Sequence, residues 1–444
     1  MEVSGFGRYP RFETAIIEPS SLADAVHLQS GLTGFVPRGN GRAYGDAAIG
    51  TASCLSLLEL NQIRDFDEVS GRLTVEAGVL LADIIAMFLP RGFFPPVVPG
   101  TRFVTVGGMI ASDIHGKNHH GAGSFGKYVE SMNIALPGGE VVLCSPDENR
   151  ELFEATIGGM GLTGTVVLAT FSLVRVETGW IKQHTIVAGD LAAALAILSK
   201  HEESSYSAAW IDCLAKGSAL GRSLIYLGDH ASAAEIEAQS HGAPQMPSTR
   251  ARRLSVPLDL PSFTLNRWTV AAFNEVYFRR GASSAGKVFI NGIEPFFFPL
   301  DGILNWNRIY GRRGFLQHQS VVPEERAQAV YGEILGRIAK RGNASFLAVL
   351  KKLGASSKGL LSFPQPGFTL ALDLAIDSGI FDFLDTLDEL VAAAGGRIYL
   401  AKDARQSRAT FESGYPNLQR FREIRQNAGV QDRIKSRLSE RLGI

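Results

Sequence analysis

The sequence predicts an α+β protein of two domains. Residues 14–80 alternate short apolar runs with turn residues, as in TAIIEP, SLADAVHLQSG and GFVPRG, which indicates strands and short helices mixed along the chain. From about residue 178 the pattern changes to longer helices such as LAAALAILSKH and broader strands such as FTLALDLAI. A chain of 444 residues also exceeds the usual size of a single core. These observations predict a second domain with its own sheet.

Local signals place the individual elements. LTVEAGVLLADIIAMFLPRG predicts a strand followed by an amphipathic helix, ELFEATIG a short helix, and TVVLATFSLVRVE a strand near the end of the first domain. Farther on, AAWIDCL and GFLQHQSVVP predict strands, and residues 241–262 form a connection rich in Pro and Ser. SGIFDFLDTLDELVAAAGG predicts a helix closed by glycine, RIYLAKDAR a strand, and the remaining residues terminal helices.

Composition excludes several classes of function. The chain has 44 basic and 44 acidic residues and a pI near 7.1, so no global positive field attracts nucleic acid. Cys54, Cys144 and Cys213 lie far apart without a CxxC pair, which favours buried small side chains over disulfides or structural zinc. The start MEVSGFGRYPRFETAI lacks the pattern of a signal peptide, and no later segment has the length of a membrane span. We therefore expect a cytoplasmic or peripheral membrane protein.

The segment from Pro99 to Gly126 contains seven glycines and three histidines, which leaves almost no room for a regular helix. Clustered glycines let a backbone approach a phosphate or a flat ring closely, because no Cβ stands in the way. His115, His119 and His120 have a spacing that suits metal ligands on a helix, but their glycine neighbours disfavour a helix and no cysteine or acidic pair completes a ligand set. We expect a ligand-binding loop without a metal ion, in which His119 and His120 either contact the ligand or only hydrogen-bond the loop.

A second glycine cluster, RGNGRAYGD at residues 38–46, follows the apolar run GFVP. Successive backbone N–H groups in such a turn form an anion nest for a pyrophosphate, although a plain tight turn has the same composition. A third set, Gly159, Gly161 and Gly164, matches GxGxxG, but a helix is predicted before it and a strand after it. A nicotinamide Rossmann site needs the opposite order, so these glycines indicate packing beside a cofactor that is held in another way.

The order of these motifs resembles the PCMH-type FAD-binding domain of the vanillyl-alcohol-oxidase superfamily. The motifs RGNGRAYGD, PGTRFVTVGGMIASDIHGKNHHGAGSFG, FPLDGILNWNRIYG, GFLQHQSVVP and GGRIYLAKDAR resemble, in this order, those of decaprenylphosphoryl-β-D-ribose 2′-oxidases, the flavin half of a two-enzyme epimerase. This resemblance covers nearly the whole chain. It implies an FAD-binding domain at 1–177, a substrate domain at 178–396 with a mainly antiparallel sheet flanked by helices, and a segment at 397–444 that returns to the FAD-binding domain.

The resemblance also implies FAD that is held noncovalently. Superfamily members that tether the flavin use a histidine in a G-x-G-H-S loop, whereas this chain has Arg42 in the corresponding stretch. The residues implied to contact FAD come from the two glycine clusters and two later positions: Arg38, Gly39, Asn40, Gly41, Arg42, Ala43, Tyr44, Pro99, Gly100, Thr101, Thr105, Gly107, Gly108, Ser112, His115, Gly116, Asn118, His119, Gly123, Gly164 and Tyr399.

For catalysis, the resemblance implies oxidation of the 2′-hydroxyl of a polyprenyl-phosphoryl-β-D-ribofuranose, or a similar lipid-linked pentose, to a ketone. A base must take the hydroxyl proton as the hydride leaves. Lys402, near the end of the predicted strand RIYLAKDAR, is the first candidate, and His115 is the second. The residues implied to face the substrate are Lys117, Trp210, Gln319, Lys351 and Tyr399. Lys351 offers positive charge to a phosphate, whereas strand alternation places Lys352 at the surface.

Departures from the family pattern leave other functions open. Ala371 stands where the best-known members carry a cysteine, so turnover needs no thiol there, and Thr369 and Leu353 also differ. One alternative is an FAD-dependent oxidase of free sugars, alditols or sugar lactones. A second alternative is a catalytically silent FAD-binding scaffold of a glycosylation complex, which the retained His115 and Lys402 disfavour.

Two kinds of partner are expected, the first from the resemblance and the second from the residues themselves. A short-chain NAD(P)H-dependent reductase would return hydride to the opposite face of the sugar, which completes a 2′-epimerisation towards an arabinofuranose donor for cell-envelope polysaccharide. Peripheral membrane contact is the other expectation, through the apolar run Phe296 to Leu300 and the basic Arg250, Arg252 and Arg253. A core strand and a solvated loop explain these two features equally well.

Overall fold

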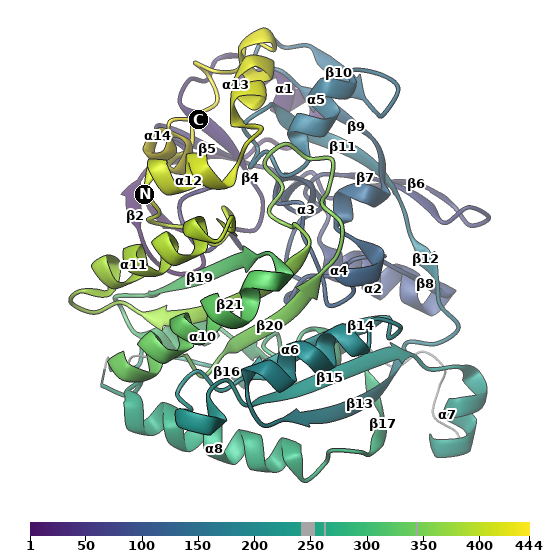
Figure 1. Ribbon diagram of the computed structural model, residues 1–444. Helices are drawn as coiled ribbons and strands as arrows, with labels where there is room; N and C mark the ends of the chain where they lie inside the picture. Colours follow the sequence, from purple (N-terminus) through teal and green to yellow (C-terminus); the bar gives the residue numbers. More distant parts are fainter. Residues whose placement is uncertain (241–253, 262, 343–344) are drawn as a thin grey trace.

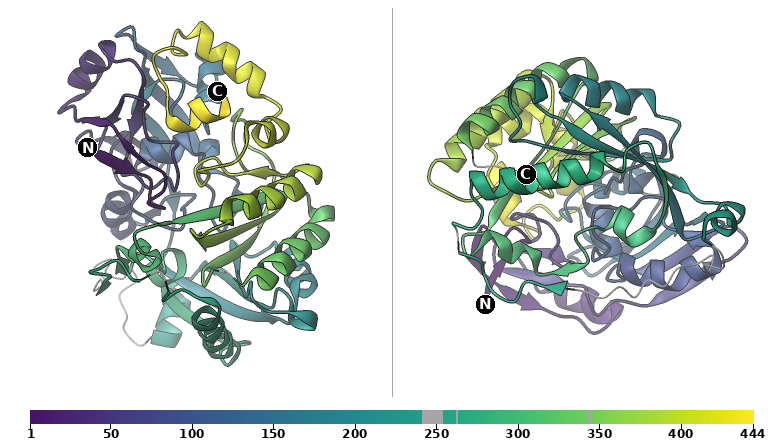
Figure 2. Two further views of the ribbon diagram at one scale, coloured as in Figure 1. Left: turned by 90° about the vertical axis from the view of Figure 1, so that its left-hand side faces the viewer. Right: turned by 90° about the horizontal axis from the view of Figure 1, so that it is seen from below.

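The computed structural model of the chain describes residues 1–240, 254–261, 263–342 and 345–444. In Figure 1 the N-terminal residues and the C-terminal helices lie in the upper half, and a large sheet with its helices lies in the lower half. The predicted α+β class is confirmed. Figure 2 shows the two halves in contact from two further directions.

The upper half contains two sheets. The first is parallel and has the order β3 (Ala15–Ile17), β5 (Ser53–Ser56) and β4 (Phe35–Arg38). The second is antiparallel and has the order β10 (Val141–Cys144), β9 (Val129–Ala135), β11 (Thr165–Ser172), β7 (Arg72–Glu76) and β6 (Ile63–Asp67). The helices of this part of the chain are α1 (Leu22–Ser30), α2 (Leu81–Phe88), α3 (Val106–Ala111), α4 (His119–Ala122) and α5 (Arg150–Thr156). The strand and amphipathic helix predicted from LTVEAGVLLADIIAMFLPRG are β7 and α2.

The expectation that the glycine-rich segment has no regular helix is wrong. Gly107 and Gly108 lie inside α3, whose N-terminus is capped by the side chain of Thr105 accepting from the Gly108 N–H at 3.2 Å. Val106, Met109 and Ile110 of this helix are fully buried. Burial of these apolar side chains and the cap offset the cost of two helical glycines.

The lower half is built on one eight-stranded sheet in which every pair of neighbours is antiparallel. Its order is β17 (Val288–Gly292), β13 (Trp180–Ala188), β15 (Ser223–His230), β14 (Tyr206–Ile211), β20 (Ala348–Leu353), β21 (Gly367–Ala375), β19 (Phe315–Val322) and β22 (Arg397–Ile398). The helices α6 (Leu191–Lys200), α10 (Glu324–Arg341) and α11 (Ile380–Ala393) pack on one face, and α8 (Arg267–Ala282) packs on β13 and β15 (Figure 1). The predicted antiparallel sheet flanked by helices is confirmed.

Strand alternation gives this sheet two chemically different faces. In β20 the side chains of Ala348 and Leu350 are buried in the apolar core with the helices, whereas Val349 and Lys351 line a cavity on the other face. Lys352 lies on the helix side, where its ammonium pairs with Glu324 at 2.9 Å. The prediction that Lys351 and Lys352 face opposite ways is therefore confirmed.

Shorter elements connect these layers. They are β1 (Glu2–Ser4), β2 (Arg11–Glu13), β8 (Phe93–Phe94), β12 (Val174–Arg175), β16 (Leu254–Ser255), β18 (Ile303–Leu304), α7 (Ala233–Ser240), α9 (Ile293–Phe297), η1 (Leu89–Arg91), η2 (Phe125–Tyr128), η3 (Gly217–Ala219) and η4 (Trp306–Tyr310). The three cysteines are buried and free, as predicted. Most of the connection predicted at 241–262 lies outside the described residues.

The last segment returns to the upper half through α12 (Arg408–Gly414), α13 (Leu418–Asn427) and α14 (Arg437–Leu442). Isolated bridges join Phe35 to Ile434 and Gly50 to Ser436. The guanidinium of Arg441 pairs with Asp46 at 2.9 Å and with Asp403 at 2.8 Å, which ties α14 to two loops that adjoin the cavity. The domain boundaries at 177 and 396 stay a prediction.

Arg441→Gln should lower the free energy of unfolding by about 3 kcal/mol, because it leaves two buried carboxylates without their cation. Arg420→Gln is the matched control, since its ion pair with Glu151 is exposed and such pairs contribute less than about 1 kcal/mol. Urea denaturation at neutral pH measures both variants. Equal losses would contradict the importance assigned to the Arg441 contacts.

Candidate active site

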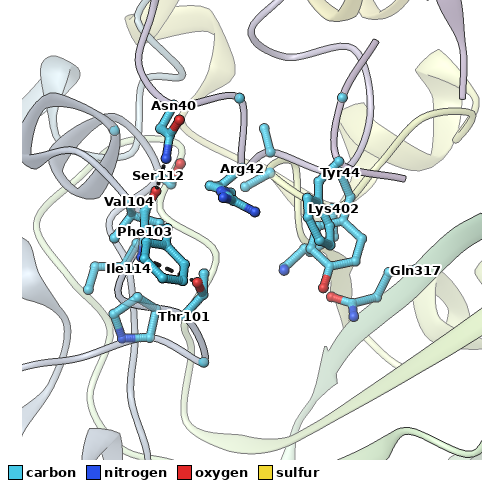
Figure 3. Close-up of a pocket in the computed structure, with 18 of the residues that line it drawn as sticks. Asn40, Arg42, Tyr44, Thr101, Phe103, Val104, Ser112, Ile114, Gln317 and Lys402 are labelled. Atoms are coloured by element: carbon cyan, nitrogen blue, oxygen red, sulfur yellow. Dashed lines mark hydrogen bonds between the residues drawn. The ribbon is translucent and has the colours of Figure 1, made fainter. Parts of the chain in front are cut away.

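A cavity of about 700 Å³ lies between the large sheet and the two glycine clusters (Figure 3). It brings together residues that are separated by more than 350 positions in the chain, from Arg38 to Lys402. The predicted site residues that line it are Arg38, Gly39, Asn40, Gly41, Arg42, Ala43, Tyr44, Pro99, Gly100, Thr101, Thr105, Gly107, Gly108, Ser112, His115, Gly116, Lys117, Gly164, Trp210, Gln319, Lys351, Tyr399 and Lys402.

The predicted nest follows β4 and keeps its backbone donors available. Arg38 holds the turn in place, because its guanidinium donates to Ala48 O at 2.8 Å and to Ser4 O at 3.0 Å. Gly41 has φ +60°, a conformation that favours glycine. Among the described residues, the N–H groups of residues 39–43 donate no hydrogen bond to a backbone acceptor. Such a turn offers several unsatisfied N–H dipoles to an anion.

The glycine-rich segment forms the next wall of the cavity. A Cβ on Gly39 would lie 2.2 Å from the Thr105 hydroxyl, so the nest and this segment pack as closely as glycine allows. Asn40 Nδ2 donates to Phe103 O at 2.8 Å, and Tyr399 OH donates to Ser112 O at 2.8 Å. Free N–H donors at one end and apolar, aromatic walls at the other fit a dinucleotide such as FAD.

Three of the residues predicted to contact the cofactor do not line the cavity: Asn118, His119 and Gly123. Asn118 Nδ2 donates to Pro96 O, and His119 Nδ1 accepts from Gly354 N at 3.0 Å, so both hold the fold around the site. The alternative that His119 only hydrogen-bonds its surroundings is therefore the better description. The described residues contain no group of three or more His, Cys, Asp or Glu side chains arranged as metal ligands.

Three lysines from different segments of the chain, Lys117, Lys351 and Lys402, line the cavity. Burial, with a contribution from the charge of Lys351, lowers the pKa of Lys117 to about 7, and burial lowers the pKa of Lys351 to about 8. The Lys117 ammonium donates to Phe296 O. The Lys351 ammonium forms no hydrogen bond or ion pair with another described residue, which leaves it available to a ligand.

Lys402 lies in the turn after β22, not on a longer strand as predicted, because β22 ends at Ile398 and a turn follows Tyr399. Its ammonium is 3.5 Å from the centroid of the Tyr44 ring, and both side chains face the cavity (Figure 3). Burial lowers the pKa of Lys402 to about 7, the charge of Asp373 opposes that change, and Lys351 reinforces it. A substantial fraction of Lys402 is therefore neutral near pH 7 and able to accept a proton.

His115 is the less basic of the two candidate bases. Gln319 Nε2 lies 3.0 Å from its Nε2, and among the described residues its Nδ1 has no partner. Burial, together with the charges of Lys351, His119 and Lys402, lowers the pKa of His115 well below its usual value. The imidazole is neutral at pH 7 and holds a proton only weakly.

Sequence reasoning missed two residues beside Lys402. Gln317 lines the cavity next to Tyr44 and donates from Nε2 to Asp373 Oδ1 at 2.5 Å (Figure 3). Asp373 is fully buried, and burial raises its pKa, opposed by Gln317 and by the charge of Lys402. The signal was an acidic residue in the apolar strand GFTLALDLA, in register with Gln317 of β19 and on the same face as Ala371.

The structure does not support lipid contact by the apolar run Phe296 to Leu300. Phe296 and Phe297 end the helix α9 and are buried together with Phe298, so they belong to the core, although to a helix and not to the strand considered. Arg250, Arg252 and Arg253 lie outside the described residues. No helix in the described part of the chain is both long and apolar enough to cross a membrane.

Comparison with known proteins agrees with this geometry. Residues 18–145 match the FAD binding domain family. The decaprenylphosphoryl-beta-D-ribose oxidase of Mycolicibacterium smegmatis is 37% identical over 99% of this chain and 96% of its own length. The chain belongs to the decaprenylphosphoryl-β-D-ribose oxidase family. It is thus an FAD-dependent oxidoreductase of the predicted PCMH type, and its nest lies within the matched domain.

Similarity to other sugar-type oxidases is confined to part of the chain. The D-arabinono-1,4-lactone oxidase of Yarrowia lipolytica is 32% identical over 26% of this chain and 22% of its own length. The L-gulonolactone oxidase of Bos taurus is 28% identical over 31% of each chain. Among these three, the relative from Mycolicibacterium is the one whose match extends over nearly the whole chain.

Asp373→Asn should move the acid limb of the pH profile of flavin reduction to lower pH. With Lys402 as the predicted proton acceptor, the rate should rise with pH through the pKa of Lys402, about 7. Removing the negative neighbour that raises this pKa lowers it further, while the amide preserves the shape of the side chain. Stopped-flow reduction across a pH series measures the limb, with Asp382→Asn on the exposed side of α11 as the control. An unmoved limb, or one moved to higher pH, would contradict the coupling.

Proposed function

We propose that the chain oxidises the 2′-hydroxyl of a polyprenyl-phosphoryl pentofuranose to a ketone, the first step of a two-enzyme 2′-epimerisation. The observation that carries this proposal is the set of three lysines, Lys117, Lys351 and Lys402, whose side chains are half-buried and line the same cavity. Buried ammonium groups favour an anionic ligand, because a negative charge restores the solvation that burial removes. The name of the Mycolicibacterium relative supports a phosphorylated, lipid-linked pentose.

Lys402 is the proposed base. FAD, when bound, supplies the hydride acceptor for this reaction. Lys402 combines a lowered pKa with a position on the cavity wall and a turn fixed by its own N–H, which donates to Tyr399 O at 2.9 Å. His115, with its much lower pKa and its contact with Gln319, is better suited to orient the reacting sugar than to take its proton.

Each remaining group of the site has a proposed task. Lys351 binds the phosphate, and Lys117 adds positive charge beside it. Gln319, Trp210 and Tyr399 complete the walls around the sugar, with the Trp210 indole fixed by donation to Phe346 O at 3.1 Å.

The proposal includes the cofactor linkage, the domain division and the partners. FAD is held noncovalently, because the nest has Arg42 where tethering relatives have histidine. Residues 1–177 with 397–444 hold the cofactor, and residues 178–396 hold the substrate. A short-chain NAD(P)H-dependent reductase consumes the keto product. The oxidase works in the cytoplasm or at a membrane surface, and the polyprenyl chain keeps the substrate at the membrane.

A prenyl-phosphoryl pentofuranose should reduce the flavin at least about 100-fold faster than the free pentose, because binding energy from the phosphate and prenyl groups orients the reacting carbon. Anaerobic loss of flavin absorbance measures both rates. Lys351→Ala should remove most of this preference, and Lys352→Ala, on the opposite face of the same strand, should keep it. Fast reduction by free sugars, alditols or lactones without any gain from the lipid phosphate would favour the alternative oxidase.

A further inference from the structure

Exposed apolar side chains are concentrated in one region of the molecule. Among the described residues, sixteen large apolar side chains are exposed, and ten of these lie between Leu254 and Leu304. We define the apolar face by six of these ten residues: Leu254, Leu258, Phe263, Trp268, Phe273 and Val276. Trp268 is 78% exposed and Val276, two helical turns farther along α8, is 68% exposed. A monomeric soluble surface rarely exposes so much apolar area in one place, so this face needs an occupant.

The apolar face adjoins the lining of the cavity. Phe273 stacks on Tyr277 of the same helix, and Tyr277 packs on Trp210 at 4.8 Å between ring centroids. Both Tyr277 and Trp210 line the cavity, as does Leu304. In Figure 1, α8 lies along the lower end of the molecule, and the view from below in Figure 2 shows it on the near side. Ring contacts therefore connect this face with the lining of the cavity.

The same region carries a surplus of positive charge. Residues 254–314 contain seven Lys and Arg against four Asp and Glu, although the whole chain has no net charge. All four acids are already engaged by arginines: Asp259 by Arg8, Glu275 by Arg222 and Arg279, and Glu294 and Asp301 by Arg102. In contrast, the exposed Arg280, Lys287, Arg312 and Arg313 form no ion pair with another described residue.

We propose that the apolar face docks on an anionic phospholipid bilayer, so that the mouth of the cavity opens towards the membrane. Apolar and aromatic side chains with unpaired cations around them are the combination that binds the interfacial region of such a bilayer. A second copy of the chain is a poorer occupant, because a two-fold contact through this face would bring the same unpaired cations together. The proposal rests on the proposed function only for what enters the mouth, a lipid-linked substrate drawn from the bilayer.

Flotation of the FAD-loaded enzyme with vesicles of phosphatidylcholine and phosphatidylglycerol in equal parts tests the docking. Wild-type enzyme should float with these vesicles. The double variant Trp268→Gln, Val276→Gln should bind at least about tenfold more weakly, because two exposed side chains lose their apolar transfer energy. The matched control is Val69→Gln, Val141→Gln, which removes two exposed valines from the upper half and should bind as wild type does.

Two further measurements separate docking from folding and from catalysis. Brominated phospholipid should quench Trp268 fluorescence in the wild-type enzyme, and Trp268→Phe should lose that quenched component, whatever the stability of the double variant. The double variant should reduce its flavin with a soluble short-chain prenyl-phosphoryl pentose as fast as wild type, and it should lose rate only with the long-chain substrate in vesicles.

Three results would overturn the proposal. They are a wild-type enzyme that does not float, equal flotation of the double variant, and a wild-type dimer in analytical ultracentrifugation that the double variant abolishes. Vesicle binding that follows the apolar face while no lipid-linked pentose reduces the flavin would support the docking and count against the proposed substrate.

Discussion

The rest of the site depends on one constraint: three lysine ammonium groups are partly withdrawn from water around a single cavity. Burial of an unpaired charge is among the costliest things a protein can do, and the usual response is a lowered pKa or an anionic partner. The cavity uses both responses. Lys402 has a buried carboxyl nearby in Asp373, while Lys351 has none in the described part of the chain and so favours a ligand that brings its own charge.

The cavity forms because strands of one sheet place alternate side chains in the core and in the cavity. In β20, Leu350 faces the helices and builds the core, and the adjacent Lys351 faces the ligand. The opposite wall is built on glycine turns, which bring backbone donors close to the ligand between side chains such as Asn40 and Arg42. The C-terminal Arg441 then joins the loops of Asp46 and Asp403, so that the nest and Lys402 keep a fixed relation.

Much of this architecture could be predicted from the sequence, because it rests on local patterns. The nest, the reversed GxGxxG at Gly159 to Gly164 and the opposite faces of Lys351 and Lys352 are all where periodicity and glycine spacing place them. The helix α3 could not be predicted, since two glycines argue against it and only tertiary burial of Met109 and Ile110 makes it stable.

Local patterns of this kind could not predict the electrostatic partners of Lys402. Asp373 and Gln317 lie 56 positions apart and meet only through the register of β19 with β21. Lys402 is separated from Tyr44 by most of the chain, and no local motif encodes the contact between its ammonium and that ring. The prediction that Asn118 and His119 contact the cofactor differs from the structure, in which both side chains hold the fold around the site. A glycine-rich motif does not indicate which of its members turn away from the ligand.

The central claim is that Lys402 takes the hydroxyl proton while the rest of the cavity holds cofactor and anion. Anaerobic stopped-flow reduction of Lys402→Ala by a prenyl-phosphoryl pentofuranose tests it most directly, with Lys127→Ala as a surface control. The account predicts that Lys402→Ala retains its flavin spectrum and loses about 10²- to 10⁴-fold in the rate of reduction. A variant that keeps its flavin and is reduced at nearly the wild-type rate would contradict the account.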